Sequence, residues 1–211
     1  AYLILLIKYL SGQFVAIDLG RFKMFKIVKK QRLNDIMTLM EIEAPLIAKK
    51  VKAGQFIILR IDEHGERIPL TVADADINAG TITIIFQKVG ATTMQLDTLE
   101  ENSHILDLVG PLGSATEYGD VKNVAVIGGG AGCAIAFPQA KTLHNMGVHV
   151  DMIAGFRSKD IIILEEEMRA VSSRLFITTD DGSNGQKGFV TDVLKQQIEA
   201  GVTYDLVIAI G

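Results

Sequence analysis

The sequence VAVIGGGAGCAIAFPQAK, from Val124 to Lys141, decides the fold of this chain. Its first four residues are apolar and mostly β-branched, which is typical of a buried parallel strand. The strand leads directly into a turn that contains Gly128, Gly129, Gly130 and Gly132. Glycine lets a backbone approach a diphosphate closely and adopt positive φ, and the N-terminus of a following helix attracts the anion. The stretch therefore predicts a diphosphate site between a strand and a helix.

The spacing of these glycines is G-G-G-x-G, which differs from the G-x-G-x-x-G fingerprint of dinucleotide-binding proteins. The acidic residue expected at the end of the next strand is also missing, and Arg157 stands nearby. Since proline is tolerated only in the first turn of a helix, Pro138 predicts a helix that begins near Ile135. A glycine turn that only packs the strand against the helix is the alternative interpretation.

The bulk composition limits the classes of function. The chain has 211 residues, of which 48% are hydrophobic, and this suits one large or two small domains. A formal net charge of −4 argues against nucleic acid or an anionic membrane as the main partner. The single cysteine, Cys133, excludes a disulfide framework and fits a reducing, cytoplasmic compartment.

Both ends of the chain carry expectations of their own. The apolar run 1–10 has no basic region ahead of it and is interrupted by Lys8, which argues against a signal peptide or an anchor. We interpret residues 1–23 as an extension upstream of a start at Met24, and a strand added to the barrel is the alternative. The expected strand from Leu206 to Ile210 would end at the ligand-binding edge of a sheet, so we expect the domain to continue beyond Gly211.

Residues 24–114 have the pattern of a small antiparallel barrel or sandwich, with about six short strands between turn signals. Thr92 and Gln95 have the T-x-x-Q spacing of a capping box, which predicts a helix start at Thr92. The amides of Thr93 and Met94 would then point outward. A second anion site and an ordinarily capped short helix are equally open interpretations.

Strands and helices alternate in residues 123–211, after a polar connector at 115–122. This order predicts a parallel sheet with right-handed crossovers. One helix is expected to be capped by Ser158 and to present an apolar stripe at Ile161, Leu164, Met168 and Val171. The predicted fold thus has two domains, an antiparallel β-barrel followed by an α/β parallel-sheet nucleotide-binding domain.

A set of motifs in this order resembles the ferredoxin–NADP⁺ reductase superfamily over Met24 to Gly211. The motifs are RIPLT at 67–71, GPLG at 110–113, GGGAG at 128–132, FPQAK at 137–141, LEEEMRAVS at 164–172 and TTDDGSNGQKGFVTDVL at 178–194. They are most similar to one branch, which holds the small subunit of NADH-dependent ferredoxin:NADP⁺ oxidoreductase, also called sulfide dehydrogenase, and the electron-transfer subunit of dihydroorotate dehydrogenase. The resemblance implies that FAD lies across the barrel.

The FAD contacts carried over by this resemblance come from three segments of the barrel. They are Arg67, Pro69, Leu70, Thr71, Ile85, Phe86, Gln87, Gly90, Thr92 and Thr93. The segment around Thr71 matches the one against the flavin ring, with the Thr71 hydroxyl within reach of N5, and this makes Thr71 the catalytic candidate. Many relatives carry their phosphate-binding arginine at the position of Ile68, whereas here the arginine is Arg67, one residue earlier.

The resemblance also implies that NAD(H) or NADP(H) binds the α/β domain, with its diphosphate over Gly128 to Gly132 and its adenosine half near Arg157 and Asp181. Arg157 could pair with a 2′-phosphate or remain solvated. The implied activity is hydride transfer between NAD(P)H and FAD, with single electrons passing to a [2Fe–2S] cluster. The cluster cysteines are expected beyond Gly211, because one cysteine cannot replace four.

The implied partners are ferredoxin and a larger flavin/iron–sulfur or dehydrogenase subunit. One alternative is a self-sufficient ferredoxin reductase or sulfide dehydrogenase that needs no partner. The other alternative is a nucleotide-sensing module that binds without turnover.

Overall fold

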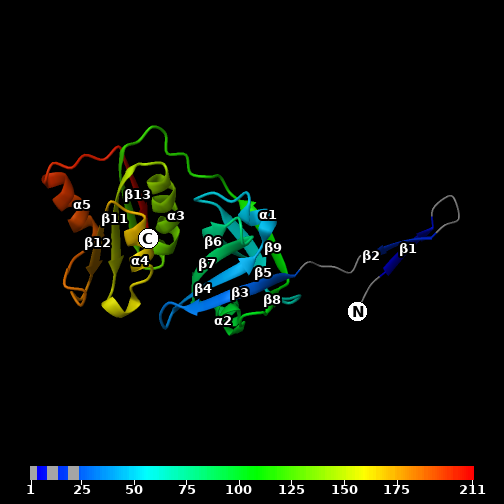
Figure 1. Ribbon diagram of the computed structural model, residues 1–211. Coiled ribbons are helices and arrows are strands. Elements are labelled where there is room, and N and C mark those ends of the chain that lie inside the picture. The colour runs from blue at the N-terminus through cyan, green and yellow to red at the C-terminus, as the bar shows by residue number, and fades with distance from the viewer. Residues whose placement is uncertain (1–3, 9–13, 19–23) are drawn as a thin grey trace.

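The computed structural model describes residues 4–8, 14–18 and 24–211, and its main body has two domains (Figure 1). Strands β1 (Ile4–Lys8) and β2 (Phe14–Asp18) pair antiparallel with each other in a two-stranded sheet. Their assignment to an upstream extension remains a prediction, and the rest of residues 1–23 lies outside the described residues. No helix in the described part of the chain is long and apolar enough to cross a membrane.

The first domain is a seven-stranded antiparallel sheet in the order β8-β3-β4-β7-β6-β5-β9, curved into a nearly closed barrel. Its strands are β3 (Phe25–Arg32), β4 (Met37–Glu43), β5 (Phe56–Arg60), β6 (Ile68–Asp76), β7 (Thr81–Gln87), β8 (His104–Ile105) and β9 (Asp107–Leu112). Two short helices accompany them, α1 (Pro45–Ala48) and α2 (Ala91–Thr98). The β3–β4 turn is held by Asn34, whose side-chain oxygen accepts hydrogen bonds from the amides of Ile36 and Met37 at 3.0 and 2.9 Å.

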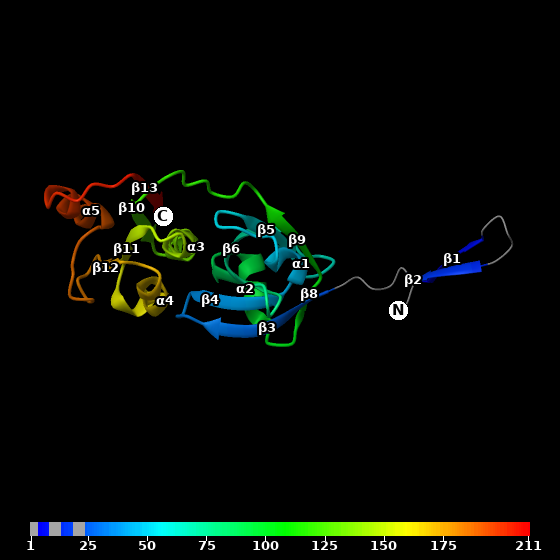
Figure 2. The same cartoon turned by 45° about the horizontal axis from the view of Figure 1, so that its top comes forward.

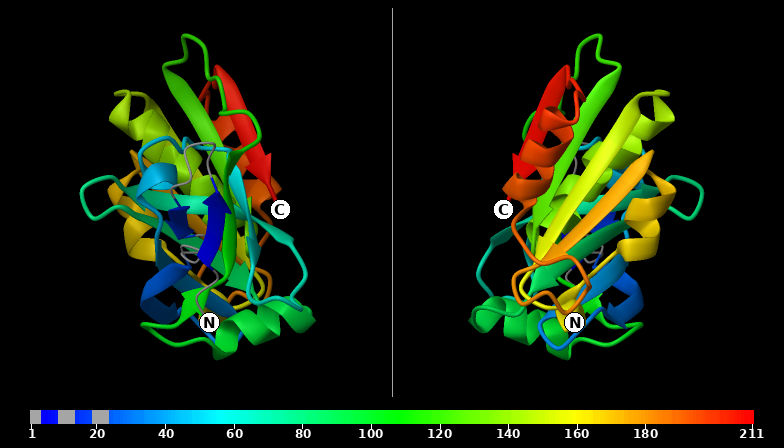
Figure 3. Two further views of the ribbon diagram at one scale, coloured as in Figure 1. Left: turned by 90° about the vertical axis from the view of Figure 1, so that its right-hand side faces the viewer. Right: turned by 90° about the vertical axis from the view of Figure 1, so that its left-hand side faces the viewer.

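The second domain is a four-stranded parallel sheet in the order β12-β11-β10-β13 (Figure 3). Its elements are β10 (Asn123–Gly129), α3 (Gly132–Asn145), β11 (His149–Phe156), the 3₁₀ turn η1 (Lys159–Ile161), α4 (Glu165–Ala170), β12 (Arg174–Thr179), α5 (Val190–Glu199) and β13 (Leu206–Ile210). Helix α3 lies on the face toward the barrel, and α5 covers the opposite face (Figure 2). The predicted fold, a barrel followed by an α/β domain, is confirmed.

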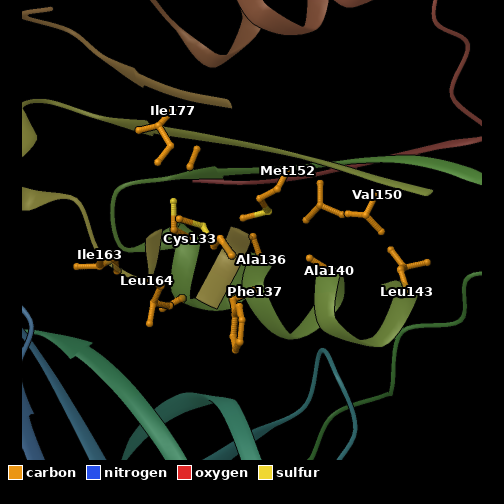
Figure 4. Close-up of a cluster of buried hydrophobic side chains, with 14 of the residues drawn as sticks. Cys133, Ala136, Phe137, Ala140, Leu143, Val150, Met152, Ile163, Leu164 and Ile177 are labelled. Atoms are coloured by element: carbon orange, nitrogen blue, oxygen red, sulfur yellow. The ribbon is translucent and has the colours of Figure 1, made fainter. Parts of the chain in front are cut away.

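Helix α3 begins earlier than predicted, at Gly132 instead of near Ile135, and Pro138 lies inside it. Proline is usually confined to the first turn of a helix because it cannot donate a backbone hydrogen bond. In α3 the tertiary packing stabilises the helix by more than this missing hydrogen bond costs. One side of α3, including Cys133, Ala136 and Leu143, packs against the parallel sheet (Figure 4). Pro138 is buried. The packing of α3 therefore stabilises the helix through the proline.

The predicted helix after Ser158 is also wrong in its extent. The chain forms the short turn η1, and α4 starts only at Glu165, because Leu164 has a φ of +57° and interrupts any continuous helix. Leu164 and Met168 are nevertheless buried in the core of the domain. The apolar stripe therefore predicted burial of Leu164 and Met168 correctly, although these residues do not lie on one continuous helix.

Candidate functional site

A cavity of about 530 Å³ lies at the carboxyl edge of the parallel sheet, where the α/β domain meets the barrel. The α/β domain contributes the ends of β10, β11 and β12 and the first turn of α5, and the barrel contributes Ile36, Met37 and Gln87. Ligands of open α/β sheets bind at this edge. The cavity is large enough for part of a dinucleotide and has walls from both domains.

The four glycines of the loop divide into two pairs. Gly129 and Gly130 line the cavity. Gly130 has a φ of +52°, and a Cβ added to it would meet no atom within 4 Å. Its amide donates to the carbonyl of Gly155 at 2.8 Å, which ties the loop to β11. Gly130 therefore combines a left-handed backbone with open space above it, as a close-approach site for an anion requires.

Gly128 and Gly132 have a different environment, away from the cavity lining. A Cβ on Gly128 would lie 2.8 Å from the Cα of Cys133, and a Cβ on Gly132 would collide with the carbonyl of Ile210. These two glycines allow α3 to approach β10 and β13 closely. Close packing of the helix against the strands thus explains why Gly128 and Gly132 lack a side chain. The other two glycines, Gly129 and Gly130, line the cavity.

The first turn of α3 adds backbone donors beside this loop. Its N-cap is Ala131, which has no side chain able to cap the helix. Within residues 24–211, the amides of Ala131 and Gly132 have no hydrogen-bond acceptor. Ala131 lines the cavity. The helix therefore directs unpaired donors and the positive end of its dipole to this region.

Arg157 and Asp180 are the charged side chains on the cavity wall, and both are exposed. Sequence reasoning chose Asp181, but the Asp181 carboxylate accepts hydrogen bonds from the amide and hydroxyl of Ser183, at 2.9 and 2.6 Å. These hydrogen bonds lower the pKa of Asp181. Asp181 therefore shapes the turn, and its neighbour Asp180 lines the cavity.

Sequence reasoning also missed an aromatic side chain on this wall. Phe189 is 65% exposed although it is large and apolar, and it lies at the N-cap of α5. The signal was present in the sequence as an aromatic residue between Gly188 and the predicted helix. An exposed ring of this kind provides a flat surface against which a base can stack.

On the barrel side, the three residues at the end of β7 have three different environments. Gln87 lines the cavity. Phe86 is buried in the barrel core, and Ile85 packs against the apolar cluster of the α/β domain. Among the predicted contacts on β7, Gln87 thus has the side chain on the cavity, and the side chain of Phe86 belongs to the core.

The RIPLT segment lies at the start of β6, where Pro69 is exposed and Leu70 and Thr71 are half-buried. Arg67 forms an ion pair with Asp107 of β9, at 2.5 Å between Nη1 and Oδ2. Arg60 approaches the same carboxylate at 4.0 Å. The guanidinium of Arg67 is thus held beside the barrel strand β9, and about half of its surface is exposed.

Helix α2 begins at Ala91 with Gly90 as its N-cap, so the prediction of a cap at Thr92 is wrong. The side chain that bonds to the backbone at this helix start belongs to Thr93. Its hydroxyl accepts hydrogen bonds from the amides of Val89 and Gly90, both at 3.1 Å. The amide of Met94 is bonded to the carbonyl of Gly90 at 2.9 Å and does not point outward. A T-x-x-Q spacing is a weak signal because a glycine two residues earlier serves equally well.

The corrected helix start still presents unpaired donors. The amides of Ala91, Thr92 and Thr93 have no acceptor in the described part of the chain. The hydroxyl of Thr92 donates to Glu66 at 3.3 Å, which brings the helix start next to the RIPLT segment. Two of the predicted FAD-contacting segments are thus neighbours.

The other end of α2 is anchored by Asp97, which is buried and accepts a hydrogen bond from Thr38 at 2.5 Å. Burial raises the pKa of Asp97, but the Thr38 hydrogen bond and the cations Lys88, Lys30 and Arg32 outweigh it, so that this pKa is lowered. Asp97 therefore remains ionised and fixes α2 against the barrel.

The comparisons with known proteins bear on both domains. No protein-family model matches the chain. It is 46% identical over 196 residues to an uncharacterized protein in the adh 3′ region of Clostridium beijerinckii, covering 89% of this chain and 66% of that protein. It is 41% identical over 169 residues to a homolog of the dihydroorotate dehydrogenase B (NAD(+)) electron transfer subunit from Thermotoga maritima, covering 80% and 60%.

The electron transfer subunit of dihydroorotate dehydrogenase B (NAD(+)) from Streptococcus pneumoniae is 33% identical over 179 residues, covering 82% of this chain and 69% of that subunit. The chain thus spans between 60 and 69% of the length of these three relatives.

Solved structures agree with the sequence relatives. An NADH-dependent reduced ferredoxin-NADP oxidoreductase, studied for flavin-based electron bifurcation, matches with a TM-score of 0.84 and 36% identity, covering 92% of this chain and 69% of that one. A ferredoxin reductase of carbazole 1,9a-dioxygenase has the same fold, with a TM-score of 0.68 at 19% identity over 82% of this chain and 56% of that one. The chain therefore belongs to the ferredoxin–NADP⁺ reductase superfamily, in the branch that contains the dihydroorotate dehydrogenase B electron transfer subunits.

Proposed function

We propose that this chain binds FAD on its barrel and NAD(H) or NADP(H) on its α/β domain, and that a hydride passes between the two cofactors. The observation that carries the proposal is the cavity at the carboxyl edge of the parallel sheet, which has walls from both domains. When they are bound, the nicotinamide supplies a hydride and the flavin accepts it and can release electrons singly.

The residues of the cavity fit a dinucleotide diphosphate. Gly130 has a left-handed backbone and empty space where a Cβ would lie, and the amides of Ala131 and Gly132 find no acceptor among the residues that the structure describes. In our proposal these donors and the α3 dipole bind the diphosphate. Phe189 then offers a surface for the adenine ring.

The fit to FAD rests on the start of α2 and on β6. The amides of Ala91, Thr92 and Thr93, which have no acceptor in the described ranges of the chain, suit a pyrophosphate, and the Thr92 hydroxyl is in contact with Glu66 beside the RIPLT segment. We propose that Pro69 and Leu70 lie against the flavin ring and that the Thr71 hydroxyl orients it. Hydride transfer requires no side-chain acid or base, so these residues bind, orient and exclude water.

The choice between NAD(H) and NADP(H) depends on Arg157 and Asp180. Arg157 would attract a 2′-phosphate, whereas the carboxylate of Asp180 would repel it and can accept hydrogen bonds from ribose hydroxyls. Both side chains lie on the same cavity wall. The proposal therefore covers both nucleotides, and affinity measurements with each decide between them.

We further propose that the electrons continue to an iron–sulfur centre or ferredoxin through a larger partner subunit. The printed names of the relatives, an electron transfer subunit and a ferredoxin-NADP oxidoreductase, support this proposal. Cys133 is not a candidate ligand, because it is buried and burial raises the pKa of its thiol to about 12. A [2Fe–2S] cluster would need four ligands from sequence outside this chain.

Anaerobic titration of the FAD-loaded, full-length protein with NADH and with NADPH tests the proposal. We expect at least one nucleotide to bleach the flavin absorbance. A protein that binds a nucleotide but keeps an oxidised flavin would be a sensor, and failure of both nucleotides to bleach the flavin would refute the oxidoreductase function.

A further inference from the structure

The barrel and the α/β domain are joined by an ion pair next to a second cleft. Lys141 of α3 places its Nζ 2.6 and 2.7 Å from the two carboxylate oxygens of Asp74 of β6. Of the ion pairs formed within residues 24–211, this is the one that connects the two domains. Both partners line a cleft of about 330 Å³ together with Tyr118 and Pro138.

The geometry around Asp74 is set by the barrel backbone. The register between β6 and β7 shifts between Val72 and Asp74, which marks a β-bulge at this point. Bulges redirect a side chain relative to its strand. The Asp74 carboxylate also accepts a hydrogen bond from the amide of Ala75 at 2.8 Å, which restricts its rotamer. Asp74 is therefore preorganised to receive Lys141.

The ion pair joins the two elements that carry the two proposed cofactor sites. Thr71 lies three residues before Asp74 on β6, which corresponds to roughly 10 Å along the strand. The glycine loop ends at Gly132, nine residues before Lys141, which corresponds to roughly 14 Å along α3. A rotation of one domain about this contact would therefore move the strand with Thr71 relative to the loop with Gly130.

Apolar contacts also join the two domains. Met37 of β4 packs into the apolar cluster of the α/β domain, together with Phe137 of α3. Asp74 and Lys141 lie where α3 and β6 are in contact, and both side chains are 37% exposed at the edge of the cleft. Around this point α3 packs against β6, and the ion pair adds a directional charge contact to that packing.

We propose that Asp74 and Lys141 are positioning residues that set the orientation of the two domains for hydride transfer. This inference rests on the proposed function. Their pairing contributes little to stability because the side chains are partly exposed. It contributes to rate, because a displacement of about 1 Å between reacting groups lowers a rate by as much as about 100-fold.

The test uses the FAD-loaded, full-length protein carrying Lys141→Gln, Asp74→Asn, or the charge reversal Asp74→Lys with Lys141→Asp. We expect each single variant to lower the rate of flavin reduction at saturating nucleotide by at least about tenfold, with bound flavin and Tm unchanged. The charge reversal and the conservative Lys141→Arg should recover most of the rate. Lys29→Gln is the control. It removes the ion pair Lys29–Glu41 at 3.1 Å, which is similarly exposed but joins two strands of the barrel domain.

A second readout is independent of turnover. Spin labels at Ile77→Cys on the barrel and Ile198→Cys on α5 report the distance between the domains, since both positions are exposed and Cys133 is buried. Pulsed electron paramagnetic resonance should give a narrow distance distribution in the otherwise unchanged protein and a broader or shifted one with Lys141→Gln. The Lys29→Gln control should leave the distribution unchanged.

The inference is overturned if the Lys141→Gln and Asp74→Asn variants reduce flavin at the same rate as the Lys29→Gln control. It is also overturned if their distance distributions are the same as that of the control. A lower flavin content or a lower Tm in both single variants, without recovery in the charge reversal, would show that the ion pair has only a structural role. This result would also overturn the inference. If the unchanged protein shows no flavin reduction, the proposed function fails instead, and the distance measurement alone decides on domain orientation.

Discussion

Substitution of Gly130 by alanine separates the binding role of the glycine loop from its folding role. Gly130 has a φ of +52°, and an added Cβ would project into open space beside the cavity. A left-handed backbone costs an alanine about 1–2 kcal/mol, so we expect the free energy of unfolding to fall by that amount. The methyl group would occupy the space through which we propose a diphosphate approaches the loop. We therefore expect nucleotide affinity to fall at least about tenfold, or about 1.4 kcal/mol.

Gly147→Ala is the matched control for the backbone strain. Gly147 follows α3, has a φ of +79°, and also has no atom within 4 Å of an added Cβ, but it is absent from the cavity lining. Urea denaturation should show a similar loss of stability in both variants. Isothermal titration calorimetry with NAD(H) and NADP(H) should show weaker binding only in Gly130→Ala. Equal affinity in the two variants would refute the assignment of Gly130 to the diphosphate site.

Three further predictions concern other parts of the chain. Gly132→Ala should destabilise the protein by about 1–3 kcal/mol, measured by urea denaturation, because its Cβ collides with the Ile210 carbonyl; unchanged stability would contradict the packing role. Arg157→Gln should weaken NADPH binding more than NADH binding if Arg157 meets a 2′-phosphate, and equal calorimetric effects would show a solvated side chain. Asp151→Asn should cost about 2–3 kcal/mol at pH 7, below the value for a fully buried pair because the Arg174 side chain is 40% exposed.

The pH dependence of the last prediction follows from the surroundings of Asp151. This side chain is fully buried in β11, pairs with Arg174, and accepts a hydrogen bond from the Tyr204 hydroxyl at 2.6 Å. Burial raises the pKa of Asp151, but these partners outweigh it and the pKa is lowered from 3.8. Its stabilisation is therefore complete above the ordinary pKa and is lost as the pH falls through the lowered one. Unfolding curves of the two proteins should converge in acid, and a constant difference down to pH 2 would contradict this.

The sequence allowed the fold to be predicted because its strongest signals are local. The apolar run before Gly128 and the alternation of strands and helices require no knowledge of distant contacts. The start of α3 was misjudged because Pro138 is held in the helix by packing against other elements. In the same way, no local pattern shows that Gly132 packs against Ile210 of β13, which lies far along the chain, and its contact with a diphosphate stays a prediction.

The candidate site could be predicted in outline but not residue by residue. Gly130, Gln87 and Arg157, which the sequence suggested as cofactor contacts, line the cavity, and their contacts with a cofactor stay predictions. Asp180 and Asp181 are indistinguishable by composition, and only the hydrogen bonds from Ser183 show which carboxylate belongs to the turn. The Asp74–Lys141 pair joins residues 67 positions apart, so no local pattern indicates it.

The central claim is that a hydride passes between a nicotinamide on the α/β domain and a flavin on the barrel. Single-turnover reduction of the FAD-loaded protein, with reduced nucleotide carrying either hydrogen or deuterium at the transferred position, tests this claim most directly. We predict that the flavin bleaches in one phase and that deuterium slows this phase. A flavin that stays oxidised in the presence of bound reduced nucleotide would contradict the account.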